Sequence, residues 1–496
     1  MLPSRSMRRI LVASFAAIAL FLAALALSAL RLPSRQIEIP PAPPRAVDAD
    51  EVAAHLAESI QFETVSHSTD PADLESEAFA GFRRWFEATY PKLHRTLTRE
   101  IVAGDSLLYT WAGSDPALEP VLLAAHQDVV PAENLERWTR PPFEGRIEDG
   151  FVWGRGTIDD KGALIAIAEA VERLIGEGFV PRRTLLLAFG HDEEVGGGRG
   201  ASAIAALLAS RNVRALLALD EGAAVVEGVL PGFTRPVALV GIAEKGSATL
   251  EVVARAEGGH SSTPPRETAS GILARAIQRI ESNPLPGGVV GATRQLFEYL
   301  APETPLYARV PLANLWLFAK PLDWVLSGQP GVNALLRTTT AVTMLSGSPK
   351  DNVLPVEAIA GVNFRLLPGD SSDWLLERIT EIVDDPRVEV RFKYPPREAT
   401  AVSPSDGPAF ALIQRTVAEI FPDAIFAPFL TVGGTDVRHY APITDGLYRF
   451  APFTYGAADL KLPHGIDERI AVDALPVAVD FYARFIENAS ADRGPR

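Results

Sequence analysis

The chain contains no cysteine, and this absence removes several classes of site at once. Disulfide-stapled folds, iron–sulfur clusters and thiolate zinc sites all need cysteine. Basic residues are also fewer than acidic ones, with 47 Lys and Arg against 62 Asp and Glu, which gives a formal net charge of −15. Nucleic acid is not an expected partner, since phosphate binding needs a basic face. Any metal must therefore be held by His, Asp and Glu.

Charge is missing altogether from one long run near the N-terminus. Ile10–Leu30 is uncharged and long enough to cross a bilayer as a helix. Arg5, Arg8 and Arg9 precede it, and basic residues there favour an N-terminus in the cytoplasm with the rest of the chain outside. Residues 1–31 are therefore predicted to be a membrane anchor. A cleaved signal peptide is the alternative, because small residues near the end of the run suit cleavage, and the protein would then be secreted.

Beyond a proline-rich linker at 32–46, strands and helices alternate. The apolar run in 182–190 is typical of a buried strand, and the apolar spacing in 161–178 is typical of a helix. Such alternation predicts a mostly parallel sheet covered by helices on both faces. Near residue 242 the pattern changes to strands typical of an antiparallel sheet, and near 396 the first pattern returns. The predicted domain organisation is one α/β domain in two parts, 47–241 and 396–490, interrupted by an α+β domain, 242–395, with an apolar insert at about 295–345.

Polar residues gather where the predicted strands of the first domain end. They are His126 and Asp128, Asp159 and Asp160, Glu193 and Glu194, and Asp220 and Glu221. Ligands of parallel sheets bind at the carboxyl ends of the strands, so these groups are expected at one rim. Any one group alone would be typical of a local ion pair, a helix cap or surface charge. Together they predict an acidic pocket with one imidazole, which suits zinc, cobalt or manganese.

Spacing within these groups suggests different roles. His126 and Asp128 are two apart on an extended segment, so both side chains face the same way. Asp128 can then accept the second N–H of the imidazole and fix its orientation. Glu193 and Glu194 are adjacent and point in different directions on an extended chain. One can bind a metal while the other acts as a general base on water.

These motifs resemble those of the M20 metallopeptidases, over nearly everything from about residue 45 to the C-terminus. "HQDVVP" resembles the first motif, "GRGTIDDKG" the second, "DEEVGG" the third, and "LDEG" and "KLPHGIDE" the remaining two. The resemblance implies a dimetal exopeptidase domain of α/β class with an inserted α+β lid of the dimerisation type. It also implies two divalent ions, with zinc expected and cobalt or manganese as alternatives.

The resemblance assigns roles to single residues. It makes His126 a ligand oriented by Asp128, Asp159 the bridge between the metals, Glu193 the general base, and Glu194 and His464 ligands. The peptide after the bridging Asp is expected to be cis, at Asp159–Asp160. The remaining ligand is Glu221 by comparison with the family's "LDEG", with Asp220 as the alternative.

Further motifs of the family concern the substrate. "GGHSSTPP" resembles the lid motif whose His, here His260, polarises the scissile carbonyl and stabilises the oxyanion. Asn352 and Arg365 match further lid motifs. "GGTDVRHY" resembles a loop that places Gly434 and Arg438 near the substrate's carboxylate, which Arg438 could bind with two hydrogen bonds. A structural ion pair is the alternative role for each arginine.

Within the family, three features resemble the carboxypeptidase S and PM20D1-like branch: the N-terminal apolar segment, the run "HQDVVPAENLERWTRPPFEG", and the long insert. The resemblance implies a membrane-anchored hydrolase outside the cytoplasm that cleaves an amide next to a free carboxylate, as a Gly-X carboxypeptidase. Hydrolysis or synthesis of N-fatty-acyl amino acids is the alternative, and a non-catalytic binding protein on the same fold is a remote one. The insert would be extra lid core, an acyl-binding surface or a membrane-facing patch. A homodimer through the lid is left open.

Overall fold

The structure, a computed structural model, describes residues 5–70, 76–230 and 232–491, so residues 1–4 of the predicted anchor lie outside it. The chain forms two compact units. The larger unit is Arg35–Ile242 with Ser403–Arg496, and the smaller unit is Met1–Ser34 with Ala243–Val402. Where the chain leaves and re-enters the larger unit, the N–H of Ser403 donates to the carbonyl of Ile242 at 2.7 Å. The N-terminal segment thus groups with the inserted part of the chain.

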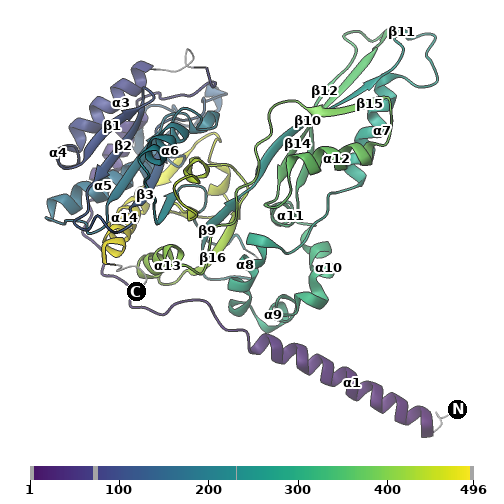
Figure 1. The fold of residues 1–496 in the computed structure, drawn as a ribbon, viewed down its shortest axis with the longest axis horizontal. Helices are drawn as coiled ribbons and strands as arrows, with labels where there is room; N and C mark the ends of the chain where they lie inside the picture. The colour runs from purple at the N-terminus through teal and green to yellow at the C-terminus, as the bar shows by residue number, and fades with distance from the viewer. Residues whose placement is uncertain (1–4, 71–75, 231, 492–496) are drawn as a thin grey trace. The chain divides into compact units, whose positions relative to one another are not determined.

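A ten-stranded sheet forms the centre of the larger unit. In spatial order its strands are β1 (Thr98–Val102), β2 (Ser106–Trp111), β6 (Leu185–Gly190), β3 (Val121–His126), β7 (Leu217–Asp220), β17 (Leu447–Arg449), β9 (Val237–Glu244), β8 (Val225–Val226) and β18 (Thr454–Tyr455), with β16 (Ile425–Thr431) paired to β9 (Figure 1). The middle is parallel, because β3 pairs with β6 and β7, and β17 with β7.

The sheet is mixed rather than mostly parallel, which corrects the prediction. β1 and β2 form an antiparallel hairpin, β2 is antiparallel to β6, and β9 is antiparallel to β8 and β17. The hairpin turn is too short for any other arrangement, since parallel neighbours need a crossover connection of a dozen or more residues. Ala103 and Gly104 make this turn with φ of 51° and 101°.

Helices cover both faces of this sheet. On β3, Leu122 and Ala124 pack into a core cluster with α6 (Ala201–Ser210). The alternate side chains of a strand face the opposite side, where α5 (Lys161–Gly176) packs on β3. The other helices of this unit are α2 (Ala49–Ile60), α3 (Ser76–Thr89), α4 (Pro91–Thr96), α13 (Pro408–Ile420) and α14 (Ala474–Ala491). A small sheet of β4 (Arg146–Glu148), β5 (Phe151–Trp153) and β19 (Arg469–Ala471) joins distant parts of the chain.

The smaller unit contains a four-stranded antiparallel sheet in the order β12 (Thr339–Ser346), β14 (Glu357–Leu366), β10 (Gly246–Arg255) and β15 (Val388–Phe392). Leu250, Val252 and Ala254 alternate along β10 and share a core with α7 (Ala269–Ser282) and α12 (Ser372–Val383). A separate two-stranded ribbon pairs β11 (Gly259–His260) with β13 (Val353–Leu354).

The apolar insert is helical, with α8 (Gly291–Leu300), α9 (Leu306–Ala313), α10 (Leu315–Leu326) and α11 (Pro330–Leu336). Pro311 lies inside α9 and Pro321 inside α10. The N-terminal run forms α1 (Arg5–Leu30), which packs against α9. Among the residues that the structure describes, α1 is the one helix long and apolar enough to cross a membrane.

Candidate metal centre

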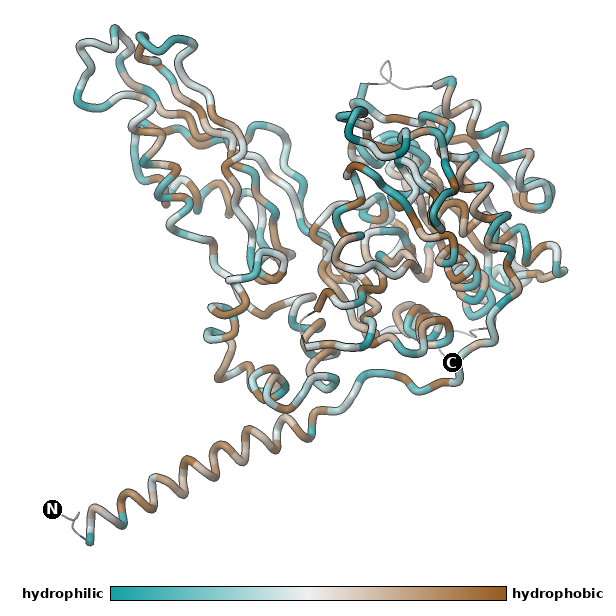
Figure 2. Tube along the Cα trace, turned by 180° about the vertical axis from the view of Figure 1, so that it is seen from behind, coloured by the Kyte–Doolittle hydropathy of each residue, from teal (hydrophilic) through white to brown (hydrophobic). Residues whose placement is uncertain are grey.

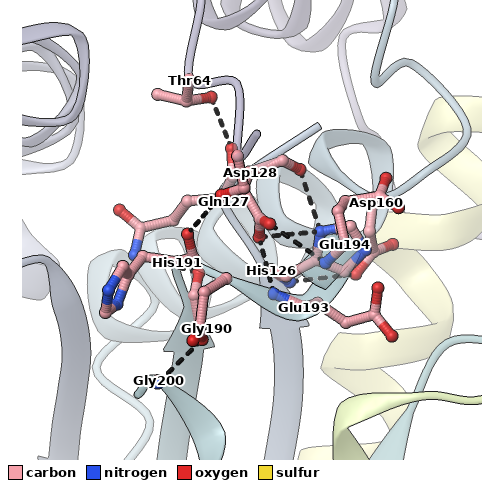
Figure 3. A network of polar contacts seen from close by, with 12 residues as sticks. Thr64, His126, Gln127, Asp128, Asp160, Gly190, His191, Glu193, Glu194 and Gly200 are labelled. Atoms are coloured by element: carbon pink, nitrogen blue, oxygen red, sulfur yellow. Dashed lines mark hydrogen bonds and ion pairs between the residues drawn. The ribbon is translucent and has the colours of Figure 1, made fainter. Parts of the chain in front are cut away.

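His126 and Asp128 lie at the carboxyl end of β3, and both are buried. The Nδ1 atom of His126 is 2.9 Å from the main-chain oxygen of Asp128 and 3.4 Å from its Oδ1. The same carboxylate accepts the backbone N–H groups of Glu193 at 3.2 Å and Glu194 at 3.1 Å (Figure 3). Asp128 therefore ties the imidazole on β3 to the loop that follows β6.

That loop is held by a second carboxylate and by glycines. Asp192 accepts the N–H groups of Arg199 and Gly200, both at 2.8 Å. Gly197 has a φ of 65°, and a Cβ there would lie 2.0 Å from Oδ1 of Asp436. Only glycine fits this position, because the backbone conformation and the close approach both exclude a side chain.

Asp159 joins the two halves of the cluster. One carboxylate oxygen is 2.9 Å from Nε2 of His126, and the other is 3.1 Å from Nε2 of His464. The same His464 nitrogen is 3.1 Å from Oε2 of Glu194. The peptide bond between Asp159 and Asp160 is cis, as expected from the sequence.

Two groups of side chains could hold a metal ion. They are His126, Asp159 and Glu221, and Asp159, Glu194 and His464, and within each group the ligand atoms lie within 4.8 Å of one another. Asp159 belongs to both. Asp220 belongs to neither; its Oδ2 accepts the backbone N–H of Val437 at 2.7 Å. Of the two alternatives left open by the sequence, the structure brings Glu221 into the cluster.

The charges of this cluster are out of balance without a cation. Burial, together with the carboxylates of Asp159 and Asp220, raises the pKa of Glu221 well above its ordinary value. The carboxylates of Asp159 and Glu194 raise the pKa of His464 to about 10. Oε1 of Glu194 is buried and has no hydrogen-bond partner among the described residues. An oxygen-rich set with an unpaired buried oxygen fits divalent metal ions.

Glu193 differs from its neighbour. No hydrogen bond or ion pair reaches its carboxylate within the described residues, and no dashed contact meets it in Figure 3. Burial, with Asp436 and Glu194 adding to it, raises the pKa of Glu193 well above its ordinary value. Such a side chain has the charge environment of a proton acceptor rather than of a solvated surface group.

Comparison with known proteins identifies the family. Residues 122–488 match the model of peptidase family M20/M25/M40. The chain belongs to peptidase family M20. The family resemblance inferred from the motifs is thereby confirmed, and the protein is a hydrolytic enzyme of that family.

Relatives of this M20 enzyme carry two kinds of name. The probable carboxypeptidase S-like 2 of Dictyostelium discoideum is 40% identical over 473 residues, covering 94% of this chain and 91% of that protein. The N-fatty-acyl-amino acid synthase/hydrolase PM20D1 of Homo sapiens is 40% identical over 452 residues, covering 89% and 88%. The structure of the M20 metallo-carboxypeptidase Sso-CP2 from Sulfolobus solfataricus matches with a TM-score of 0.63 at 17% identity, covering 89% and 99%. This last match shows the shared fold alone.

One buried ion pair of the M20 enzyme escaped the sequence analysis. Glu468 and Arg155 are both buried, and Arg155 donates to Oε2 of Glu468 at 2.5 Å. The other Glu468 oxygen accepts the N–H groups of Ile158 at 2.8 Å and Asp159 at 3.2 Å. The pairing of β19 with β5 brings these segments together. Glu468 therefore holds the backbone on which Asp159 sits. Both partners stand in motifs quoted above, Arg155 in "GRGTIDDKG" and Glu468 in "KLPHGIDE", but no local pattern pairs them.

The predicted substrate residues fall in both units. In the smaller unit, His260 pairs with Val353, the N–H of Ser261 donates to the carbonyl of Asn352 at 3.1 Å, and Arg365 lies half-buried on β14. In the larger unit, Gly434 and Arg438 lie between β16 and the end of the short helix η5 (Asp436–Tyr440). The backbone N–H of Val437 donates to Oδ2 of Asp220 at the end of β7. Arg438 is the next residue in the chain after Val437.

Proposed function

We propose that this M20 enzyme hydrolyses an amide bond next to a free carboxylate, with Glu193 as the general base. The observation that carries the proposal is the contrast between two adjacent side chains. Glu194 is drawn into the cluster by His464, whereas the Glu193 carboxylate has no partner among the described residues. Both backbones are held by the carboxylate of Asp128, which supports the proposed division of roles.

The proposed centre takes two divalent ions, most simply zinc. His126, Asp159 and Glu221 would hold one, and Asp159, Glu194 and His464 the other. When bound, such ions polarise a carbonyl group and lower the pKa of water. In the proposed reaction the Glu193 carboxylate accepts a proton from the attacking water and then donates it to the leaving amine nitrogen.

His260 is proposed to act on the carbonyl oxygen. The backbone N–H of Ser262 donates to Nδ1 of His260 at 3.1 Å, so in the neutral ring the proton lies on Nε2. This tautomer offers an N–H donor to the oxyanion that develops on the substrate. Asn352, whose carbonyl accepts from the residue after His260, would support the same ribbon.

Arginines are proposed to bind the substrate's carboxylate. Within the described residues no acidic side chain forms an ion pair with Arg365, and burial, followed by the charge of Arg397, lowers its pKa. A half-buried guanidinium beside a second one favours an anionic partner. Arg438, with Gly434 nearby, is the second proposed contact.

For the acyl side of the substrate, two candidates are carried forward. The first is an N-fatty-acyl amino acid, supported by the 40% identical human relative that is named for this chemistry. The second is a Gly-X peptide cleaved as by a carboxypeptidase, supported by the 40% identical Dictyostelium relative. A panel of N-acyl amino acids with short and long chains and of Gly-X dipeptides, offered to the zinc- or cobalt-loaded full chain, separates the two through the amino acid released.

The test of the mechanism is the Glu193→Gln variant. It should keep its metal content and lose at least roughly 10³-fold in turnover, because a general acid/base is removed while the ligands stay. Near-wild-type turnover would overturn the proposed role. A wild-type chain that binds two metals and hydrolyses nothing on the panel would leave the metal centre standing and overturn the proposed substrate class.

For localisation, we infer that α1 anchors the enzyme, with the larger unit and the inserted part of the smaller unit outside the cytoplasm. Arg5 and Arg9 stand at the N-terminal end of α1, and the run that follows carries no charge. A mature protein that begins after Leu30 would show instead that the segment is a cleaved signal.

A further inference from the structure

One face of α1 is docked onto the insert of the smaller unit. Phe21, Leu25 and Ala29 recur every four residues and therefore lie on one side of the helix. Leu25 is 5% exposed and Ala29 is fully buried, whereas residues 10–24 of α1 are exposed. The ring of Phe21 meets that of Trp316 edge-on, with centroids 6.4 Å apart. The side-chain amide of Asn314 donates to the main-chain oxygen of Leu25 at 3.2 Å.

These contacts have the character of a permanent interface. Asn314 is buried, and its amide is shared between the oxygens of Leu25 and Val310. Just beyond α1, the hydroxyl of Ser34 donates to Glu303 at 2.6 Å. Loss of α1 would uncover Asn314 and remove one of its two acceptors, so the fold itself favours an N-terminal helix that is kept.

The two helices beside α1 expose large apolar side chains. We call α9 and α10 together the collar. Tyr307 is 79% exposed, Trp316 73% and Trp324 82%, and Leu317 and Val325 are exposed as well. Large apolar side chains exposed together on two helices mark a site for protein or lipid, and Trp and Tyr are enriched where a membrane meets water. Figure 2 shows the neighbouring α1 as hydrophobic along most of its length.

The position of the collar along α1 selects lipid as the partner. At about 1.5 Å per residue, α1 rises about 18 Å from Arg9 to Phe21 and about 32 Å from Arg9 to Leu30. A hydrocarbon core about 30 Å thick therefore has Arg9 at one face and Leu30 at the other. The stretch from Phe21 to Ala29, which bears the docking stripe, then lies in the leaflet away from the cytoplasm. We propose that the collar is immersed in that leaflet, with Trp316 and Trp324 in contact with lipid; this rests on the proposed role of α1 as an anchor.

The few charges of the collar are compatible with this environment. The guanidinium of Arg309 donates to the carbonyl of Thr304 at 2.8 and 3.2 Å. Asp323 is paired with Arg337 at 2.6 Å. Lys320 is exposed on a long stem, and such side chains can reach the lipid headgroups.

Tryptophan quenching tests the proposal on the full chain. Wild type is reconstituted into bilayers whose lipids carry bromine on their acyl chains, and fluorescence is compared with that in unbrominated bilayers. The double variant Trp316→Phe/Trp324→Phe should lose most of the quenching that wild type shows. The matched control Trp374→Phe, on α12 of the same unit, should retain it. Equal quenching in wild type and the double variant would overturn the proposal.

A spin label gives a second reading that does not depend on those substitutions. Because the chain has no cysteine, Val325→Cys on α10, Leu20→Cys on α1 and Val180→Cys in the larger unit can each be labelled alone. Collision with oxygen should exceed collision with a water-soluble nickel chelate at 325 and 20, and the reverse should hold at 180. An aqueous label at 325 beside a lipid-exposed label at 20 would overturn the collar and leave the anchor standing. A label at 325 shielded from both reagents would show protein, such as a second copy, in place of lipid. A label at 20 that collides more with the nickel chelate would overturn both the collar and the anchor. The outcome of the hydrolysis assays bears on neither of them.

Discussion

Asp128→Asn removes one acceptor oxygen from the most connected side chain of the centre. The carboxylate of Asp128 accepts the N–H of Glu193 on Oδ1 and that of Glu194 on Oδ2, and Oδ1 also lies 3.4 Å from Nδ1 of His126. An asparagine has the same shape but a single oxygen. Its amino group must therefore face one of these donors, which leaves a buried N–H unpaired.

The expected magnitudes follow from these contacts. A buried donor left without a partner costs about 1–3 kcal/mol of folding free energy. Loss of a group that orients a metal-bound imidazole costs about 10–100-fold in metal affinity, which is about 1.4–2.7 kcal/mol. Turnover should fall by more than the loss of bound metal accounts for, because the backbone of Glu193 also loses its hydrogen bond to Asp128.

The assay combines metal competition with thermal unfolding. Zinc affinity is measured against a chelator of known strength, and unfolding is followed in metal-free protein, so that the two effects are read separately. Asp220→Asn is the matched control: it removes a buried charge nearby but keeps an oxygen for the N–H of Val437. Wild-type zinc affinity in a folded Asp128→Asn variant would refute the argument that Asp128 orients the centre.

Other expected outcomes concern the loop, the ligand set and protons. Gly197→Ala should destabilise the protein by about 3 kcal/mol or more, because φ is 65° and the new Cβ would lie 2.0 Å from Asp436. Gly196→Ala should cost only about 1–2 kcal/mol in backbone strain, because nothing lies within 4 Å of its new Cβ. Chemical denaturation measures both losses of stability, and equal losses would contradict the steric argument. Glu221→Gln should lower the zinc stoichiometry measured by elemental analysis while Asp220→Asn leaves it unchanged, and the reverse result would make Asp220 the ligand. Carboxylate neighbours raise the pKa of His464 to about 10, so its imidazole is protonated near pH 7 and must release that proton to bind metal. The affinity of the protein for zinc should therefore rise as the pH is raised from 6 to 9. Calorimetry in buffers of different ionisation enthalpy should detect the released protons. Zinc binding that is independent of pH and releases no proton would argue against His464 as a ligand.

Much of the site was predictable because its signals are local. A short apolar run followed by a polar pair marks the end of a strand, and this pattern located His126, Glu193 and Glu221 on neighbouring strand ends. The structure brings His126, Glu193 and Glu221 together because they end or follow parallel strands that end at the same edge. Asp159 follows β5 of the small antiparallel sheet instead, so its place in the centre has another origin. Local patterns of apolar residues likewise indicated α1 and α5.

What could not be predicted depends on contacts between distant segments. Arg155 and Glu468 are 313 residues apart in sequence, and no local pattern reveals that they meet. The hairpin of β1 and β2, which contributes to the mixed sheet, was not predicted from the sequence. The docking of α1 on α9 joins the N-terminus to the middle of the chain, and an apolar run cannot tell which of its faces will be covered.

The hydrogen bond between Ser403 and Ile242 has a consequence for biosynthesis. For the larger unit, Ala243–Val402 is one loop whose ends must meet, and closing an unstructured loop of that length costs roughly 3 kcal/mol more than closing a four-residue turn. A folded insert brings the ends together beforehand. β17, which lies between β7 and β9, is translated only after the insert is complete. On the ribosome, the inserted segment can therefore finish folding before the sheet that receives it.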